Sequence, residues 1–523
     1  MGGVIAAGDS QTAAAGAAIL AQGGNAVDGV VAAAFASFVA ESVLVNIGGG
    51  GVGLVYDPQA GATAYDFFST MPSGLLTPTA DFREIILDFG PTTQSFHIGR
   101  ASVAVPGVVA GLCRMAQDRG RLPLAQLLRP AVELARNGAI LSPGLDFVAG
   151  LLTQIFTDTP GLAALYAPTG RMIRAGDAIR LPQLADTLER LGKEGPDLFT
   201  TGSVAQTILC DQAAHGGLIT HSDLATYRVR TQPPITVAYG GHTILLPPPS
   251  SGGGVLIAFG LRLLDGLDLS PLAHNSPAHL RILAETMRQT NLARSEWERT
   301  IGPDAARIQA FLDPAHVAGY AHSLGAALAG SPMPPDPAHP NGHRDTTHIS
   351  VVDDDGLIAA VTTSAGENAG FVVGETGVCL NNMLGEIDLH PAGFHRLAPG
   401  TRLTTMMSPA IVLRDGAPIL AVGSGGSSRI RSAILQVISN VLDFNLPLAD
   451  AVTAPRIHFE HNILQIEGGI LQSTVDEMRA TGYNVVHWPD RNMYFGGTHA
   501  VALDGGTLIA AGDPRRGGAV AVV

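Results

Sequence analysis

The sequence predicts an α/β protein built as a four-layer αββα sandwich, in which two antiparallel sheets lie face to face and helices cover their outer surfaces. Three observations favour this fold. Four apolar segments each turn back on a second apolar segment at a glycine-containing turn, which is the pattern of β-hairpins. Helical segments lie between these hairpins, as expected for sheets that are covered on the outside. The 523 residues are 46% hydrophobic and only 15% charged, so the chain can bury a large core.

The first elements expected are two alanine-rich helices, at Thr12–Leu20 and Asn25–Ala40, separated by a Gly-Gly-Asn turn. Glycine ends a helix readily because it adopts the left-handed conformation of a helix cap. The chain is expected to enter the first helix directly after Met-Gly-Gly. A run of four glycines, Gly48–Gly51, then leads into the first hairpin, which turns at Asp57–Gly61.

Three further hairpins and six longer helices follow. The hairpin turns are predicted at Asp353–Gly356, Arg414–Gly416 and Asp504–Gly506. The helices are predicted at Leu122–Gly138, Leu181–Leu191, Pro277–Trp297, Ser428–Leu442, Ala449–Ala454 and Ser473–Thr481. The middle of the chain, from Leu122 to Trp297, is therefore mostly helical.

The composition narrows the partners of the chain. A formal charge of −14 argues against nucleic acid and anionic membrane surfaces, which are bound through Lys and Arg. The most apolar segment, Val30–Ile47, is interrupted by Glu41 and is too short to span a bilayer, so it is interpreted as a buried helix. The N-terminus carries no signal-peptide pattern. We therefore expect a cytoplasmic protein that acts on a small molecule.

A proline-rich segment, Ser331–Pro340, is the clearest surface linker, because proline neither extends a helix nor joins a strand ladder. It ends just before Thr346, which stands at the head of a predicted strand. Taken alone, such a threonine is an ordinary strand residue. The linker nevertheless gives the chain an exposed approach to Thr346, which is what cleavage at that position requires.

The sequence around Thr346 is similar to the γ-glutamyltranspeptidase family of N-terminal nucleophile hydrolases, whose small subunit begins with the same Thr-Thr-His pattern. The resemblance covers nearly the whole chain. Its other matching stretches are Gly23–Asp28, Gly48–Gly51, Val105–Gly107, Ala110-Gly111, Gly216–Thr220, Pro247–Gly253, Leu380–Asn382, Met407–Pro409 and Gly423–Gly426.

The resemblance implies that the precursor cuts itself between Asp345 and Thr346. Residues 1–345 would become a large subunit and residues 346–523 a small one, and the two would stay associated as one αββα unit. A threonine hydroxyl is a weak nucleophile until a base takes its proton. Cleavage supplies that base, because the new α-amino group of Thr346 has a reference pKa of about 7.7 to 8.0.

The family resemblance also assigns the groups that assist Thr346. Gly426 and Ser427 correspond to the paired oxyanion-hole glycines, and Ser364 to a threonine that orients the nucleophile. Ser364 also fits a second interpretation, a strand-end serine that caps a loop. Gly48–Gly51 and the glycine turn before Ser427 lack the lysine of a phosphate-binding loop, so neither predicts a nucleotide site. No metal and no cofactor is predicted.

The expected substrate pocket departs from the family pattern at its carboxylate-binding end. The arginine that grips the α-carboxylate of a γ-glutamyl substrate corresponds to Phe68. A second arginine, Arg83, lies 15 residues after Phe68 and restores the contact only if the loop between them folds back. The family's serine pair on the same carboxylate appears as Thr405 and Met406. Carboxylate binding is therefore expected to be weak.

At the amine-binding end, Gly366 and Met383 replace two amide side chains of the family, whereas Glu386 keeps the acidic partner. Three functions remain open. The first is hydrolysis of a non-γ-glutamyl amide, either an oxamate-like acid amide or an acylated side chain of the cephalosporin-acylase kind. The second is a genuine γ-glutamyltransferase or glutathione hydrolase, and the third is an inactive binding or structural relative. A homodimer of the processed molecule is also left open.

Overall fold

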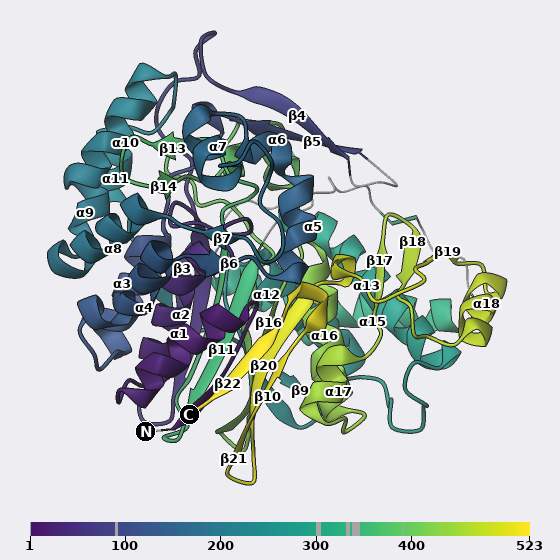
Figure 1. Ribbon diagram of the computed structural model, residues 1–523. Helices are drawn as coiled ribbons and strands as arrows, with labels where there is room; N and C mark the ends of the chain where they lie inside the picture. Colours follow the sequence, from purple (N-terminus) through teal and green to yellow (C-terminus); the bar gives the residue numbers. More distant parts are fainter. Residues whose placement is uncertain (1, 89–92, 300–304, 331–334, 337–345, 391) are drawn as a thin grey trace.

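The computed structural model describes residues 2–88, 93–299, 305–330, 335–336, 346–390 and 392–523. Two antiparallel sheets form the centre of the molecule (Figure 1). The first sheet has the order β22 (Ala519–Val522), β1 (Gly3–Ala7), β11 (Thr347–Asp353), β12 (Ile358–Ser364), β2 (Gly50–Asp57), β3 (Gly61–Phe67) and β8 (Arg230–Gln232). The second has the order β21 (Thr507–Gly512), β20 (Gly497–Asp504), β16 (Ala417–Gly425), β15 (Ala410–Arg414), β10 (His242–Leu246) and β9 (Ile235–Tyr239).

The two sheets pack face to face through a thin apolar layer. Side chains alternate along a strand, so every second residue of each strand faces the opposite sheet. The buried residues of this layer come from both sheets: Val4, Ala6, Leu54, Ala64, Val352 and Ile358 from the first, and Leu245, Ile411, Leu413, Ala421 and Val501 from the second. The small side chains among them allow the sheets to approach closely.

Helices cover both outer faces, which completes the predicted αββα order. The first sheet is covered by α1 (Ser10–Ala21) and α2 (Ala26–Ala40). The second is covered by α12 (Gly252–Leu264), α16 (Arg429–Leu442) and α17 (Leu448–Thr453).

The helices outside these two layers are α3 (Val108–Arg119), α4 (Leu124–Asn137), α5 (Pro143–Leu151), α6 (Thr153–Phe156), α7 (Pro160–Tyr166), α8 (Pro182–Glu194), α9 (Asp197–Thr200), α10 (Ser203–Ala214), α11 (His221–Thr226), α13 (Pro277–Arg299), α14 (Ala305–Phe311), α15 (Pro314–Leu328) and α18 (Gln472–Ala480). The minor strands are β4 (Arg83–Asp88), β5 (Thr93–Ile98), β6 (Ala139–Ile140), β7 (Ala178–Ile179), β13 (Val372–Val373), β14 (Val378–Cys379), β17 (Ile457–Glu460), β18 (Ile463–Ile466) and β19 (Asn484–His487). Short 3-10 turns include η2 (Met383–Gly385) and η3 (Ile387–Leu389).

The four predicted hairpins are confirmed as β2–β3, β11–β12, β15–β16 and β20–β21, and the predicted helices are confirmed within a few residues of their ends. Two expectations were wrong. The chain does not enter α1 directly, because Gly3–Ala7 first forms β1 between β11 and β22. Val30–Ile47 is buried but is not one helix, since α2 ends at Ala40 and Glu41 is its C-cap.

Each sheet contains strands from both sides of the predicted cleavage point. In the first sheet, β11 lies between β1 and β12, so a strand that follows Thr346 pairs with the strand nearest the N-terminus. The segment that contains Asp345 and most of the proline-rich linker lies outside the described residues. In the part of the chain that is described, no helix is long and apolar enough to cross a membrane.

Candidate active site

Thr346 lies directly before β11, at the end of the first sheet, and its side chain is only 2% exposed. Along β11, Val352 packs into the layer between the sheets, whereas Val351 belongs to the core under α1 and α2. Alternation therefore points Thr346 toward the second sheet and Thr347 toward the helices. The two neighbouring threonines thus face opposite sides of the sheet.

The second sheet meets Thr346 at the last residue of β16. A Cβ atom placed on Gly425 would lie 2.3 Å from the carbonyl oxygen of Thr346, well inside van der Waals contact. Only glycine fits at this position without displacing Thr346. The end of β16 therefore sets how closely the glycine turn that follows it approaches Thr346.

That turn consists of Gly426 and Ser427, which connect β16 to α16. Both have positive φ angles, 124° for Gly426 and 53° for Ser427. Among the described residues neither backbone amide donates a hydrogen bond to another group. The turn lies at the N-terminus of α16, where the partial positive charge of the helix adds to that of free amides. This is the arrangement that a developing oxyanion needs.

A buried ionic cluster supports the turn from behind. The hydroxyl of Ser428 donates to Glu460 at 2.7 Å, and the guanidinium of Arg431 contacts the other carboxylate oxygen at 3.0 Å. Burial alone would raise the pKa of Glu460, but the hydrogen bond from His458 and the charges of Arg431 and Arg294 hold that pKa well below its usual value. A carboxylate held ionised in this way fixes the first turn of α16.

Ser364 ends β12, the strand beside β11, so it lies at the same end of the sheet as Thr346. Its hydroxyl accepts a hydrogen bond from the amide of Gly366 at 3.2 Å. The carbonyl of Ser364 would lie 2.3 Å from a Cβ atom on Gly49. The four-glycine run therefore allows close backbone packing at this end of the sheet.

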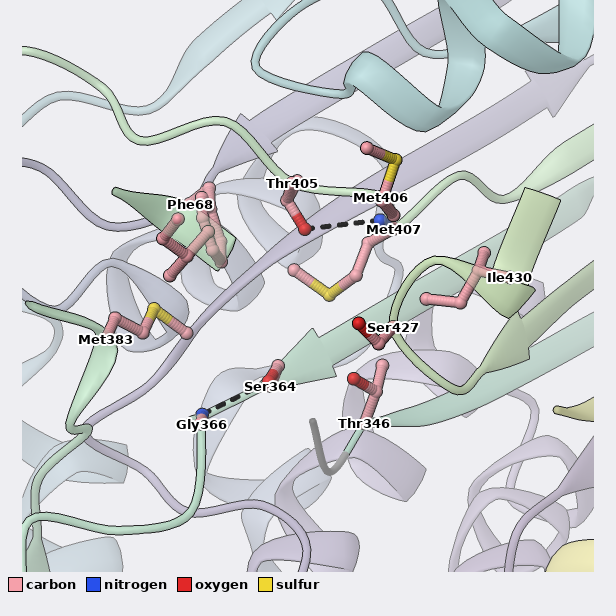
Figure 2. A pocket seen from close by; sticks show the side chains of 11 residues that line it. Phe68, Thr346, Ser364, Gly366, Met383, Thr405, Met406, Met407, Ser427 and Ile430 are labelled. Carbon is pink, nitrogen blue, oxygen red and sulfur yellow. Dashed lines mark hydrogen bonds between the residues drawn. The ribbon is translucent and has the colours of Figure 1, made fainter. Parts of the chain in front are cut away.

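Thr346, Ser364 and Ser427 line one pocket, with about 280 Å³ of empty space when its open mouth is included. Figure 2 shows Thr346 and Ser427 directed toward the same space, with Phe68 and Met383 on the opposite side. The remaining lining residues are Gly366, Leu389, Thr405, Met406, Met407 and Ile430. The predicted residues Phe68, Gly366, Met383, Thr405 and Met406 are thus brought together with Thr346. Leu389, Met407 and Ile430 were not predicted.

Phe68 forms part of the pocket wall and is only 1% exposed. Arg402 lies behind it and donates to its carbonyl oxygen and to the hydroxyl of Tyr227. The same guanidinium lies 3.7 Å from the carboxylate of Asp66, which also accepts from the amide of Phe68. Sequence reasoning missed Arg402, because only the folded chain brings it to the end of β3.

Arg83 does not enter this pocket. It stands at the start of β4, where its guanidinium makes two hydrogen bonds to Asp158, at 2.9 and 2.7 Å, and a third to Asp81 at 2.8 Å. The loop therefore does not fold back to replace the missing arginine, and the expectation that Arg83 binds substrate is not supported by its position. The planar guanidinium is fully engaged by two carboxylates.

Glu386 is buried directly behind the pocket wall. Its carboxylate oxygen Oε1 would lie 3.0 Å from a Cβ atom on Gly366, which is itself a lining residue with a φ of 65°. A side chain larger than glycine at position 366 would cover Glu386. A second carboxylate, that of Asp388, accepts from the hydroxyl of Ser427 at 3.4 Å. Two carboxylates therefore lie next to this end of the pocket.

A third carboxylate, that of Glu41, lies on the opposite side of β11 from the pocket. Glu41 is completely buried and accepts hydrogen bonds from Thr347 at 2.6 Å and Thr12 at 2.7 Å. Burial raises its pKa to about 7, and the charge of Asp9 adds to this effect. No sequence pattern had indicated this contact, which joins residues 306 positions apart.

Comparisons with known proteins identify the family and the fold of this chain. The family model described as Gamma-glutamyltranspeptidase matches residues 12–523. The chain is 32% identical to the acylase ACY 1 proenzyme of Pseudomonas sp. (strain V22), over 97% of this chain and 91% of that protein. It is 31% identical to the glutathione hydrolase proenzyme of Escherichia coli (strain K12), over 98% of this chain and 90% of that protein. The crystal structure of cephalosporin acylase from Bacillus halodurans superposes with a TM-score of 0.86 at 24% identity, covering 99% of this chain and 95% of that one.

Proposed function

Since the chain belongs to the gamma-glutamyltranspeptidase family, we propose that it is a self-processing amidohydrolase that uses Thr346 as its nucleophile and acts on amides other than γ-glutamyl amides. One observation carries the catalytic part of this proposal. Thr346, Ser364 and the Gly426–Ser427 turn come from three separate segments of the chain and line or border the same small pocket. These are the parts that acyl transfer through a threonine hydroxyl requires.

In the precursor, the Oγ atom of Thr346 attacks the carbonyl carbon of Asp345. The peptide C–N bond breaks, and the nitrogen of Thr346 takes the hydroxyl proton and becomes a free amine. Water then hydrolyses the ester between the two residues, which leaves Asp345 as a new C-terminal carboxylate. The two proenzyme relatives support such processing, because their names describe precursors.

In the processed enzyme, the amine of Thr346 accepts the proton of its own hydroxyl as Oγ attacks the substrate carbonyl. The free amides of Gly426 and Ser427 stabilise the oxyanion of the tetrahedral intermediate. The substrate C–N bond then breaks and the leaving amine takes the proton. Water attacks the acyl ester, releases a carboxylic acid and restores the hydroxyl of Thr346.

The pocket suits an apolar acyl group. Six of its eleven lining residues are apolar, namely Phe68, Met383, Leu389, Met406, Met407 and Ile430, and no lysine or arginine is among the residues found to line it. Carboxylates lie next to its polar end at Glu386 and Asp388. An acyl group with its own carboxylate, as in γ-glutamyl or oxamate-like amides, would lose water there without gaining a cationic partner. An acyl group of the acylase kind, with or without an ammonium group, meets no such penalty.

Four p-nitroanilides that share a four-carbon butanoyl skeleton and differ in the groups on its last carbon test this preference. γ-Glutamyl carries a carboxylate and an ammonium group, glutaryl only the carboxylate, 4-aminobutanoyl only the ammonium group, and butanoyl neither. We expect kcat/KM to be highest for 4-aminobutanoyl, and about 10- to 100-fold lower for γ-glutamyl, because the unpaired carboxylate costs about 1 to 3 kcal/mol. Glutaryl is expected to be the poorest of the four, since Glu386 also repels it.

Two variants assign the preference to named residues. Glu386→Gln is expected to remove the advantage of 4-aminobutanoyl over butanoyl and leave butanoyl turnover unchanged. Phe68→Arg is expected to raise kcat/KM for γ-glutamyl by about 10-fold, whereas Phe68→Leu is not. If wild-type enzyme prefers γ-glutamyl to 4-aminobutanoyl, the chain is a γ-glutamyl enzyme. If no substrate is turned over by correctly cleaved protein, the inactive relative is the better description.

A further inference from the structure

We propose that Glu41 is a positioning residue for Thr346, which holds the start of β11 from the helical side of the sheet and makes self-cleavage depend on its own ionisation. The inference rests on the proposed role of Thr346. It concerns a carboxyl group that lines no part of the pocket and that the chemistry of acyl transfer does not use.

The contact reaches the residue next to the nucleophile. Thr347 donates its hydroxyl hydrogen to Glu41 Oε2 at 2.6 Å, a short bond for this pair of groups. Thr347 also pairs with Thr363 of β12 and is the first residue of β11. Thr346 extends from this anchored residue, so a shift of Thr347 is passed to the nucleophile through one peptide unit.

The surroundings of Glu41 leave it little freedom to move. Thr12 of α1 donates to its other carboxylate oxygen at 2.7 Å, so both oxygens are held. A Cβ atom on Gly8 would lie 2.5 Å from Oε2 and 2.8 Å from the hydroxyl oxygen of Thr347. Glu41 thus joins four segments at one point: the end of α2, the start of α1, the chain after β1, and β11.

Ionisation of Glu41 changes the strength of its hydrogen bonds with Thr347 and Thr12. When Glu41 is ionised, both of its oxygens accept from threonine hydroxyls, and such charge-assisted bonds are about twice as strong as neutral ones. When Glu41 is protonated, its own proton must go to one of those hydroxyls, and that pair becomes neutral. The charged group that faces Glu41 among the described residues is Asp9, the N-cap of α1, while β11 and α1 present hydroxyls.

Self-cleavage isolates this effect, because the precursor has no free amine at Thr346 that titrates in the same range. Precursor chains collected in denaturant after brief synthesis are refolded by dilution between about pH 5.5 and about pH 8.5, and cleavage is followed on denaturing gels. For each protein, the cleavage rate at about pH 8.5 is divided by the cleavage rate at about pH 5.5. We expect this ratio to be at least about threefold larger for wild type than for Glu41→Gln. An identical pH profile for wild type and Glu41→Gln would overturn the proposal.

Two threonine variants serve as matched controls. Thr347→Val removes the hydroxyl on the nucleophile's side, and its effect on cleavage is expected to be smaller with Gln than with Glu at position 41. Thr12→Val removes the other partner and leaves β11 untouched. It is expected to keep the pH-dependent rise but to move it to higher pH, because the hydrogen bond from Thr12 lowers the pKa of Glu41. Additive effects of Glu41→Gln and Thr347→Val would overturn the proposal.

Thermal melting shows independently whether Glu41 titrates in the folded protein. A carboxyl group whose pKa is raised from 4.5 to about 7 binds its proton more tightly in the folded than in the unfolded chain. Its contribution to stability is therefore full below pH 4.5 and is lost as the pH rises through about 7. In the uncleaved Thr346→Ala background, the Tm of the Glu41→Gln variant is compared with the Tm of the protein that keeps Glu41. We expect this difference in Tm to shift in favour of the Gln variant by roughly 2 °C or more as the pH rises from about 5 to about 8.

The outcomes separate this proposal from the one on which it rests. If wild-type precursor does not cleave at any pH, the assignment of Thr346 fails. If it cleaves but its pH profile is unaffected by Glu41→Gln, only the role of Glu41 fails.

Discussion

Replacing Thr346 with alanine is expected to leave a single uncleaved chain of 523 residues and to abolish turnover. The methyl group cannot attack the Asp345 carbonyl, so neither the break in the chain nor the free amine forms. Loss of a catalytic nucleophile lowers kcat by about 10⁴- to 10⁶-fold in enzymes of comparable chemistry. Denaturing gels report cleavage, and release of p-nitroaniline from 4-aminobutanoyl-p-nitroanilide reports turnover.

Thr346→Ser is the matched control for this prediction. Serine keeps the hydroxyl and removes only the methyl group, so the variant is expected to cleave and turn over substrate at a reduced rate. Turnover by uncleaved Thr346→Ala at the wild-type rate would show that another group is the nucleophile.

A methyl group at Gly425 is expected to stop self-cleavage almost as completely. The new Cβ atom would lie 2.3 Å from the carbonyl oxygen of Thr346, so the two segments must move apart by about 1 Å to reach van der Waals contact. A displacement of about 1 Å in a catalytic group costs about 100-fold in rate. We therefore expect Gly425→Ala to fold and to cleave at least about 100-fold more slowly than wild type.

Gly325→Ala is the control for the substitution itself. Gly325 lies in α15, and nothing lies within 4 Å of a Cβ atom built there. This variant is expected to cleave normally and to be slightly more stable, because alanine favours a helix over glycine. If Gly425→Ala cleaves as fast as Gly325→Ala, the contact between β16 and Thr346 does not control the nucleophile.

Much of the fold could be predicted from local patterns, because a hairpin leaves a recognisable pattern in a short stretch of sequence. Each pairs two apolar runs across a turn that contains glycine, as at Asp57–Gly61 and Asp504–Gly506. The segment Gly3–Ala7 carries no such turn, and its partners lie more than 300 residues away at β11 and β22. A strand of this kind is visible only in the folded chain. The predicted helix Asn25–Ala40 ends where α2 does, but the interpretation of Val30–Ile47 as one helix was wrong, because the apolar stretch continues beyond the buried Glu41 that ends α2.

Among the residues proposed for catalysis, the Gly426–Ser427 turn and the strand that begins after Thr346 could be placed from the sequence because each lies in a short segment. The residues expected to bind substrate could be predicted only from the family positions to which they correspond in the sequence. Phe68 and Met406 do line the pocket, but the place of Arg83 depended on how the loop after β3 folds. Arg402 contacts Phe68 and Glu41 contacts Thr347 from distant segments of the chain, and no local pattern marks either of them.

The most direct test of the central claim is the N-terminal sequence of the purified protein after prolonged incubation. We predict two fragments on a denaturing gel that co-migrate under native conditions, and a smaller fragment whose sequence begins Thr-Thr-His-Ile-Ser, at Thr346. An intact chain of 523 residues, or a smaller fragment that begins at any other residue, would contradict the assignment of Thr346 as the nucleophile.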